Sequence, residues 1–411
     1  MQPFSTDAIL SRLGLGAFDP EAAFLAAAAM ARQDRLFCLP ARVTEVLARR
    51  GAETPIVVLG RSYFGDQFMR ALSARARILH VVDDYRAGRG EQHLGVDMIS
   101  SGQLVQLAGR DPDIVAVNGC RVGMSRPYFD ELCRANGIPC LNFEQAVRAF
   151  DLNATLDHRF GDWGDTIAAH PEAYLKLARR MADPYSVETL YALLTFHLTC
   201  NLEWLLNVAR PYSTLYFRSG LFALGAHEKM VDCGASSGES TLALIGATRR
   251  RFGHSWMIEP DRINVGKLQA LLGKHAGTDL AARLSLHAVA VGERAGEVPF
   301  EHLGHHGSAI LPSASAPGCA PSEHVRVARI DDIVDDRPTI IKLDVEGFEL
   351  PALKGAANTI REARPKIMAS AYHRSTDLLD IPALVDTLAP GYRIGLRHHT
   401  EERWDTCLYF Y

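Results

Sequence analysis

The sequence predicts an α/β protein with two Rossmann-like sheets, a smaller one preceding a larger one. Short apolar runs such as residues 56–59 and 339–345 have the length and composition of buried strands. Helix-forming stretches separate these runs, and strands that alternate with helices indicate parallel sheets covered by helices. A chain of 411 residues is also long enough for two or three domains.

The N-terminal half divides into two expected parts. Residues 1–51 read as a helical segment, because Pro20 and Glu21 begin an alanine-rich run of helix formers. Residues 52–150 form the small Rossmann-like domain. Its expected strands are residues 56–59, 78–82, 114–117 and 139–141.

The rest of the chain divides into a helical connector and a second α/β domain. Residues 151–212 contain no strand signal, and four leucines recur there at helical spacing (Leu190, Leu193, Leu194, Leu198). Residues 213–411 alternate strands and helices. The expected strands are residues 230–231, 255–258, 284–291, 298–301, 325–329, 339–345, 366–372, 392–398 and 406–411, the last two close enough to form a hairpin.

Composition limits the partners that the protein can have. The net charge of −4 provides no basic field for nucleic acid or an anionic membrane. The eight cysteines form no CxxC pair, which fits a reducing compartment. The N-terminus shows no basic leader followed by an apolar core, and its longest apolar stretch, residues 24–31, is too short to span a bilayer. We therefore expect a cytoplasmic protein with a small-molecule or saccharide partner; formation of a homo-oligomer stays open.

A glycine-rich loop indicates a nucleoside cofactor. Residues 232–238 have the form DxGxxxG between a strand and a helix, and glycine lets the backbone approach a ligand closely. Ser236 and Glu239 have the spacing of a capping box, and the next strand ends in Glu259, suited to ribose hydroxyls. The alternative is an ordinary turn and surface acid, which the complete strand–loop–helix–strand–acid order argues against. The expected cofactor contacts are Asp232, Gly234, Ala235, Ser236, Gly238, Glu259 and Asp261.

The loop favours S-adenosylmethionine over a dinucleotide. It lacks GxGxxG, and the carboxylate of Asp232 suits the amino group of a methionine moiety better than a pyrophosphate.

The same half of the chain resembles the FkbM family of methyltransferases. The resemblance is carried by VDCGASSGEST, WMIEPD, HAVAVGE, IIKLDVEGFELPALKGA, YHRSTDL and LRHH…CLYFY. It implies a Rossmann-like seven-stranded methyltransferase sheet with one antiparallel strand near the edge, and chiefly O-methylation of saccharides or natural products. It also implies cofactor roles for Asp232, Gly234, Gly238 and Glu259, and places Asp344 and Glu346 near the reacting centre. Ala371 stands where many relatives carry an acid, which directs attention to His373.

Charged residues in the strand of residues 339–345 mark the expected reacting centre. Lys342, Asp344 and Glu346 alternate and share one face while the chain stays extended. Asp344 is expected to orient or deprotonate a substrate hydroxyl, unless it only forms a structural pair with Lys342. His373, as a neutral imidazole, is a second candidate base, with a satisfied buried histidine as the alternative.

The metal question is open in the sequence. His302, His305 and His306, with Asp331 and Asp332 downstream, match no zinc pattern and read better as a polar loop over the substrate. Magnesium stays possible through Asp344 or Glu346.

The first domain repeats the cofactor logic in a weaker form. Gly60 and Gly65 follow a strand and precede a helix, and Asp83 and Asp84 end the next strand. This favours a nucleotide or sugar-nucleotide site, with a ligand-free domain as the alternative. The preferred function is O-methylation of a saccharide or glycosylated small molecule. The alternatives are a non-catalytic S-adenosylmethionine-binding module of a polysaccharide assembly complex and a nicotinamide-dependent oxidoreductase.

Overall fold

The structure, a computed structural model, describes residues 19–61, 65–121, 123–152, 163–304 and 323–411. The chain forms two compact units: residues 1–171 with 191–207, and residues 172–190 with 208–411. The predicted connector, residues 151–212, is helical over most of its described length, but it is shared between the two units. Its helices are α8 (Trp163–Ala169), α9 (Pro171–Ala178), α10 (Pro184–Thr199) and α11 (Glu203–Val208).

The first unit contains a six-stranded sheet with the order β3-β4-β2-β1-β5-β6. Apart from the short β3–β4 pair, neighbouring strands run parallel. The strands are β1 (Pro55–Leu59), β2 (Arg77–Val82), β3 (Gln92–His93), β4 (Val96–Ile99), β5 (Val115–Asn118) and β6 (Cys140–Asn142). The sequence did not predict β4, because four residues that include Asp97 make no apolar run.

The first unit also contains helices that precede, separate and follow these strands in the chain. They are α2 (Pro20–Gln33), α3 (Ala41–Arg50), α4 (Gly65–Ser73), α5 (Ser101–Arg110), α6 (Ser125–Ala135) and α7 (Phe143–Ala149). Asp19 caps α2 by accepting the N–H groups of Glu21 and Ala22, so this helix begins at the proline that the sequence marked. The first part of the predicted helical segment, residues 1–18, lies outside the described residues.

The second unit contains a seven-stranded sheet with the order β15-β16-β14-β13-β7-β8-β9. Only β16 runs antiparallel to its neighbours, one position from the edge, which confirms the expected Rossmann-like methyltransferase sheet. The strands are β7 (Glu228–Cys233), β8 (Phe252–Ile258), β9 (Leu284–His287), β13 (Ile340–Leu343), β14 (Lys366–Ser370), β15 (Ile394–His398) and β16 (Thr406–Phe410).

A smaller sheet in this unit holds β10 (Ala290–Val291), β11 (Gly296–Phe300) and β12 (Glu323–Ala328) in the order β10-β12-β11. The prediction of a single strand over residues 284–291 was therefore wrong. A tight turn, in which the Val289 N–H bonds the His287 carbonyl, ends β9 before β10 joins the other sheet.

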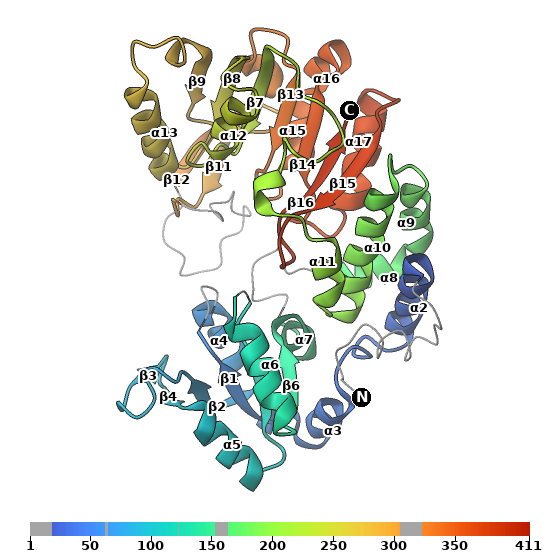
Figure 1. Ribbon diagram of the computed structural model, residues 1–411, viewed down its shortest axis with the longest axis vertical. Coiled ribbons are helices and arrows are strands. Elements are labelled where there is room, and N and C mark those ends of the chain that lie inside the picture. The colour runs from blue at the N-terminus through green and yellow to red at the C-terminus, as the bar shows by residue number, and fades with distance from the viewer. Residues whose placement is uncertain (1–18, 62–64, 122, 153–162, 305–322) are drawn as a thin grey trace. The chain divides into compact units, whose positions relative to one another are not determined.

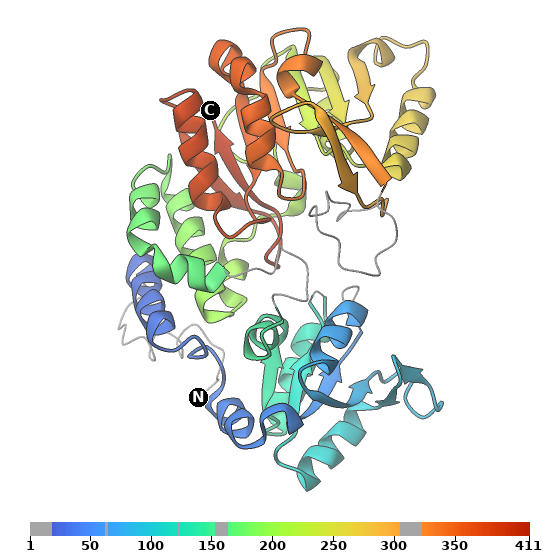
Figure 2. The same cartoon turned by 180° about the vertical axis from the view of Figure 1, so that it is seen from behind.

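Helices pack against the large sheet. α12 (Glu239–Ala247) contacts β8 and α13 (Arg262–Lys274) contacts β9. The helices α15 (Glu349–Gly355), α16 (Ala357–Ala363) and α17 (Asp377–Leu388) lie side by side, as Figure 1 and Figure 2 show from opposite sides. The short α14 (Ile330–Ile333) contacts α15 and α16. None of the described helices has the length and apolarity to cross a membrane.

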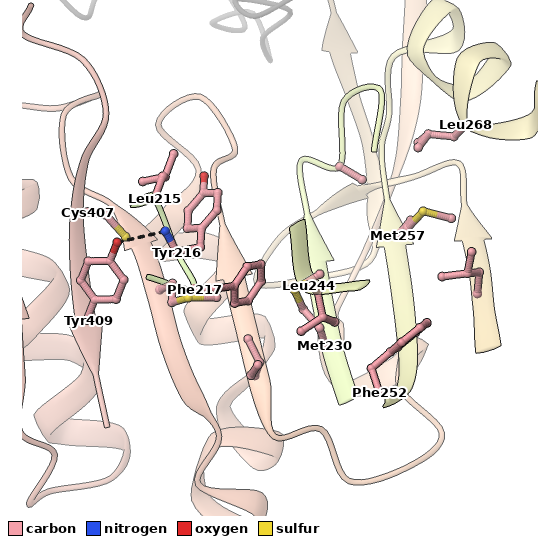
Figure 3. Packing of buried hydrophobic residues seen from close by; sticks show 14 of the residues in the cluster. Leu215, Tyr216, Phe217, Met230, Leu244, Phe252, Met257, Leu268, Cys407 and Tyr409 are labelled. Atoms are coloured by element: carbon pink, nitrogen blue, oxygen red, sulfur yellow. Dashed lines mark hydrogen bonds between the residues drawn. The ribbon is translucent and has the colours of Figure 1, made fainter. Parts of the chain in front are cut away.

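The core of this unit ties its N-terminal segment to the sheet. Tyr216 and Phe217 are buried with Met230, Met368 and Tyr409 in one apolar cluster (Figure 3). The Tyr216 N–H donates to the Tyr409 hydroxyl at 3.1 Å, the dashed line in Figure 3. This hydrogen bond fixes the backbone of Tyr216 on the sheet, and the Tyr216 side chain extends from there toward Asp344.

Candidate active site

The predicted cofactor loop lies between β7 and α12. Gly234, Ser236 and Gly238 all have positive φ, at 74°, 49° and 99°. A Cβ on Gly234 would lie 1.9 Å from the carbonyl oxygen of Asp344. Glycine is thus required at position 234 by the neighbouring strand's backbone, a reason that the sequence did not reveal.

The start of α12 differs from the prediction. The helix begins at Glu239 with Gly238 as its N-cap, and no side chain caps it. Ser236 makes no capping box with Glu239. Its backbone is in the left-handed region, and its N–H donates to Glu259 Oε2 at 2.8 Å. The Glu239 carboxylate turns back to the N–H and hydroxyl of Ser237. The capping-box prediction was wrong because the loop remains non-helical as far as Gly238, so Ser236 lies too early in the chain to be the N-cap.

Asp232 is completely buried and held by protein groups. Its Oδ2 accepts the hydroxyls of Ser240 at 2.6 Å and Thr241 at 2.7 Å. Its Oδ1 faces the Lys342 ammonium at 3.4 Å. Oδ2 is therefore satisfied by hydrogen bonds within the protein, while Oδ1 has the ion pair with Lys342 but no hydrogen bond. A direct contact of Asp232 with a methionine amino group stays a prediction.

Glu259 closes the loop from the end of β8. Its two oxygens accept the N–H groups of Ser236 and Asp261, at 2.8 and 2.9 Å. Burial raises the pKa of Glu259 to about 7, although these two N–H groups act to lower it. Each carboxylate oxygen has a further lone pair, so the group can still accept ribose hydroxyls.

Ala235 and Asp261, the other expected cofactor contacts, also lie in this loop region. The Ala235 N–H bonds the Ile258 carbonyl, and its side chain is buried. Asp261 is buried and caps α13 through Oδ1, while Oδ2 accepts the Gly304 N–H at 2.9 Å. In this structure Asp261 starts a helix and anchors residue 304.

Asp344 lies at the carboxyl end of β13, where two tyrosines hold it. The Tyr216 hydroxyl donates to Oδ2 at 3.1 Å, and the Tyr372 hydroxyl donates to Oδ1 at 3.0 Å. Burial alone would raise the pKa of Asp344, but the charges of Lys342 and His373 lower it below its usual value. The carboxylate is therefore ionised, fixed, and 24% exposed.

His373 is fully buried among three carboxyl groups. Its Nε2 lies 3.4 Å from Glu346 and 3.7 Å from Asp344, and its Nδ1 lies 2.9 Å from Glu349. Burial would lower the pKa of His373, but Glu349 and Glu346 raise it well above its usual value. A protonated imidazole accepts no proton, so this environment does not fit the expected neutral base.

The charged residues of the strand do not stay on one extended face. β13 ends at Leu343, and Glu346 has a φ of 53° in the turn that follows. Glu346 still reaches His373, but through the turn. Lys342 pairs with Asp232 on the neighbouring strand β7 and donates to the carbonyls of Cys233 and Gly234. The structural ion pair of Lys342 is therefore with Asp232, and not with Asp344 as the alternative had it.

Sequence reasoning missed four groups of this site: Tyr216, Tyr372, Glu349 and Asp405. Glu349 begins α15, is buried, and accepts the Val345 N–H at 3.0 Å. Burial and the charge of Asp344 raise the pKa of Asp405 to about 7. The motif LDVEGFE contains Glu349 as its third acid, which was the available signal; Tyr216 lies over a hundred residues away and gave none.

The other metal candidates do not come together. Among the described residues, Asp344, Glu349 and His373 form a group whose ligand atoms lie within 4.8 Å of one another. Asp331 instead accepts the N–H groups of Asn358 and Thr359. His302 accepts the Arg262 N–H, and His305 and His306 lie outside the described residues.

The predicted site of the first unit is described only in part. Gly60 has a φ of 74°, and a Cβ there would lie 2.2 Å from the sulfur of Cys120. Asp83 and Asp84 accept the N–H groups of Tyr85 and Ser101. Residues 62–64 of the loop lie outside the described residues, and the nucleotide site stays a prediction.

Comparison with known proteins gives one family match and one close structural match. Residues 232–394 match the family described as the methyltransferase FkbM domain. The crystal structure of methyltransferase FkbM from Methylobacillus flagellatus KT is 48% identical, covers 96% of this chain and 100% of its own, and superposes with a TM-score of 0.87. A precorrin-6y C5,15-methyltransferase from Geobacter metallireducens GS-15 is 14% identical over 46% of this chain and 80% of its own, with a TM-score of 0.27. No curated protein is similar enough to count as a match.

Proposed function

The chain belongs to the FkbM methyltransferase family, and on that premise we propose that it transfers a methyl group from S-adenosylmethionine to a hydroxyl of a saccharide or a glycosylated small molecule. One observation carries this proposal. An ionised, partly exposed carboxylate, Asp344, stands at the end of the strand that pairs directly with the strand of the glycine-rich loop. Ligands of such sheets bind beyond the carboxyl ends of the strands.

The residues around the loop fit the proposed cofactor. S-adenosylmethionine, when bound, supplies a methyl group already activated by a sulfonium. Glu259 has lone pairs left for the ribose hydroxyls, because each oxygen accepts one backbone N–H. Gly234 and Gly238 both adopt left-handed backbone conformations, which glycine takes without strain and which allow the tight turn of the loop.

Asp344 would hold the acceptor hydroxyl. Its lowered pKa makes it a weak base, so its first role is orientation through a hydrogen bond. Tyr216 and Tyr372 fix both oxygens, and the carboxylate keeps lone pairs and exposed surface with which to meet an acceptor. Asp405, with a pKa of about 7, is better matched to receive the proton that the hydroxyl loses on methylation.

Methyl transfer to defined acceptors tests the proposal. The protein is incubated with S-adenosylmethionine and a panel of saccharides, glycosides and matched aglycones, and products are analysed by mass spectrometry. Methylated oxygen in a sugar-bearing acceptor is expected, and Asp344→Asn should lower turnover about 10²–10⁴-fold while cofactor affinity persists. Methylation of nitrogen or carbon only, or near-native turnover in Asp344→Asn, would contradict it. The cytoplasmic location and the lack of a nucleic-acid partner belong to the same proposal.

A further inference from the structure

The group of Asp344, Glu349 and His373 contains more than a set of acids. One potential ligand atom from each residue lies within 4.8 Å of the others, a spacing that a single ion can bridge. The three residues come from separate places: the end of β13, the first turn of α15 and the segment after β14. The sheet topology, rather than one loop, assembles them.

Two buried polar groups in this cluster lack hydrogen bonds. His373 has no exposed surface, and neither ring nitrogen makes a hydrogen bond, although Nδ1 lies 2.9 Å from Glu349 Oε1 as an ion-pair contact. Glu349 is 1% exposed, and its Oε2 is also without a partner. Buried polar atoms are nearly always satisfied, so unpartnered atoms within one buried cluster indicate a missing ligand.

The negative charge around His373 favours a cation as the missing ligand. Asp344, Glu346 and Glu349 all lie within 4 Å of the His373 ring. The ammonium group of Lys342 is already paired with Asp232. Several carboxylates in a buried site are costly unless a cation compensates them.

We infer that Asp344, Glu349 and His373 bind a divalent transition-metal ion, Mn²⁺ or Zn²⁺. The ion would take the place of the ring proton of His373, because a ligand must be deprotonated to bind a metal. Neutral imidazole together with carboxylates suits these ions, whereas Mg²⁺ prefers oxygen ligands alone. The donor set therefore differs from the magnesium site through Asp344 or Glu346 that the sequence left open. Three protein ligands leave further coordination positions, as in metal sites that act on substrates.

The ion would hold the acceptor. Asp344 is the only one of the three ligands with appreciable exposure, 24% against 0% and 1%, so an acceptor oxygen reaches the ion from its side. This role rests on the proposed function, while metal binding itself does not. An acceptor with two adjacent oxygens would chelate the ion and so be selected over one with an isolated hydroxyl.

Metal titration tests the inference directly. The full-length protein is dialysed against a chelator and titrated with Mn²⁺, and free Mn²⁺ is followed by electron paramagnetic resonance. We expect saturation at about one ion per chain, and at least ~10-fold weaker binding in His373→Gln and Glu349→Gln. The control His254→Gln, a half-buried histidine that bonds Ser285, should bind as the wild type does. If one variant does not fold, Asp344→Asn replaces it, because that ligand is the most exposed.

The absence of saturable Mn²⁺ and Zn²⁺ binding in the wild type would overturn the inference. Folded variants that bind as tightly as the wild type would do so too. Metal-free protein that still methylates a saccharide would overturn the role in holding the acceptor and leave the proposed function intact. Saturable binding without any methyl transfer would support the metal site and contradict the proposed function.

Discussion

The Lys342 ammonium lies 3.4 Å from the Asp232 carboxylate. The two residues are direct partners in the paired strands β13 and β7. Both side chains are buried, at 3% and 0% exposure. Lys342 also donates to the carbonyls of Cys233 and Gly234, so one ammonium group holds the start of the glycine-rich loop. The pair connects the cofactor side of the site to the acceptor side.

Replacing Lys342 should therefore destabilise the second unit strongly. Lys342→Met leaves Asp232 buried with an uncompensated charge, at a cost of about 3–5 kcal/mol in the free energy of unfolding. Chemical denaturation of both proteins measures the difference. Lys229→Met is the matched control, because Lys229 on β7 pairs with an exposed partner, Asp336, and should lose little. Equal losses in the two variants would contradict the role of the buried pair.

Gly234→Ala should unfold or weaken the protein before it affects the cofactor. The new Cβ would lie 1.9 Å from the Asp344 carbonyl, at a φ of 74° that disfavours alanine. We expect a loss of about 2 kcal/mol or more in thermal or chemical unfolding. Gly246→Ala, in α12 with no atom within 4 Å of its Cβ, should be neutral or gain up to ~1 kcal/mol. A Gly234→Ala variant of wild-type stability that lost only cofactor affinity would show that the ligand, not the strand, requires glycine.

Glu259 should make cofactor affinity depend on pH. Its pKa is raised to about 7, so the carboxylate is protonated below that pH and offers ribose hydroxyls a weaker acceptor. Calorimetry should show the dissociation constant for S-adenosylmethionine falling as pH rises from 6 to 8. Glu259→Gln should weaken binding by about 1.5–3 kcal/mol and remove the pH dependence. Glu239→Gln, next to the loop, should keep it; an unchanged dependence in Glu259→Gln would exclude Glu259.

His399 should make the second unit sensitive to acid. Burial lowers the pKa of His399 to about 4, while the unfolded chain has the ordinary value of about 6.5. Below pH 6.5 the unfolded state binds the extra proton, so the stability that the neutral ring contributes is lost as pH falls toward 4. The stability difference between wild type and His399→Gln should therefore shrink by up to about 1.4 kcal/mol per pH unit in that range. Denaturation at several pH values measures it, and a difference independent of pH would refute the assignment.

The sequence predicted the large sheet because most of its strands contain short apolar runs between helix-forming segments. The strands β7, β8, β13 and β14 are almost wholly buried, and such runs need no tertiary information to be recognised. The short strands β3, β4 and β10 were not predicted as separate strands, since the local pattern is weak in two to four residues. Pairings such as Lys342 with Asp232 depend on sheet order, which the sequence does not state.

The candidate site was predictable only where its residues lie in one motif. Asp344 and Glu346 came from the segment LDVEG, but Tyr216 reaches Asp344 from a loop 128 positions away. The protonation of His373 could not be predicted either, because its pKa is set by Glu349 and Glu346, which fold around the ring only in three dimensions.

The position of β16 has a consequence for how the second unit is made. This strand is the last of the described elements in the chain, yet it lies between β14 and β15 and not at the margin of the sheet. Until the ribosome has released residues 406–410, β14 has an open edge and Tyr216 lacks its anchor on Tyr409. Folding during synthesis would therefore pass through a state in which the strands around the glycine-rich loop, β7 and β8, are paired while the edge of β14 is still open. Such an exposed edge invites pairing with other chains, so slow synthesis or stalling near this point should promote aggregation.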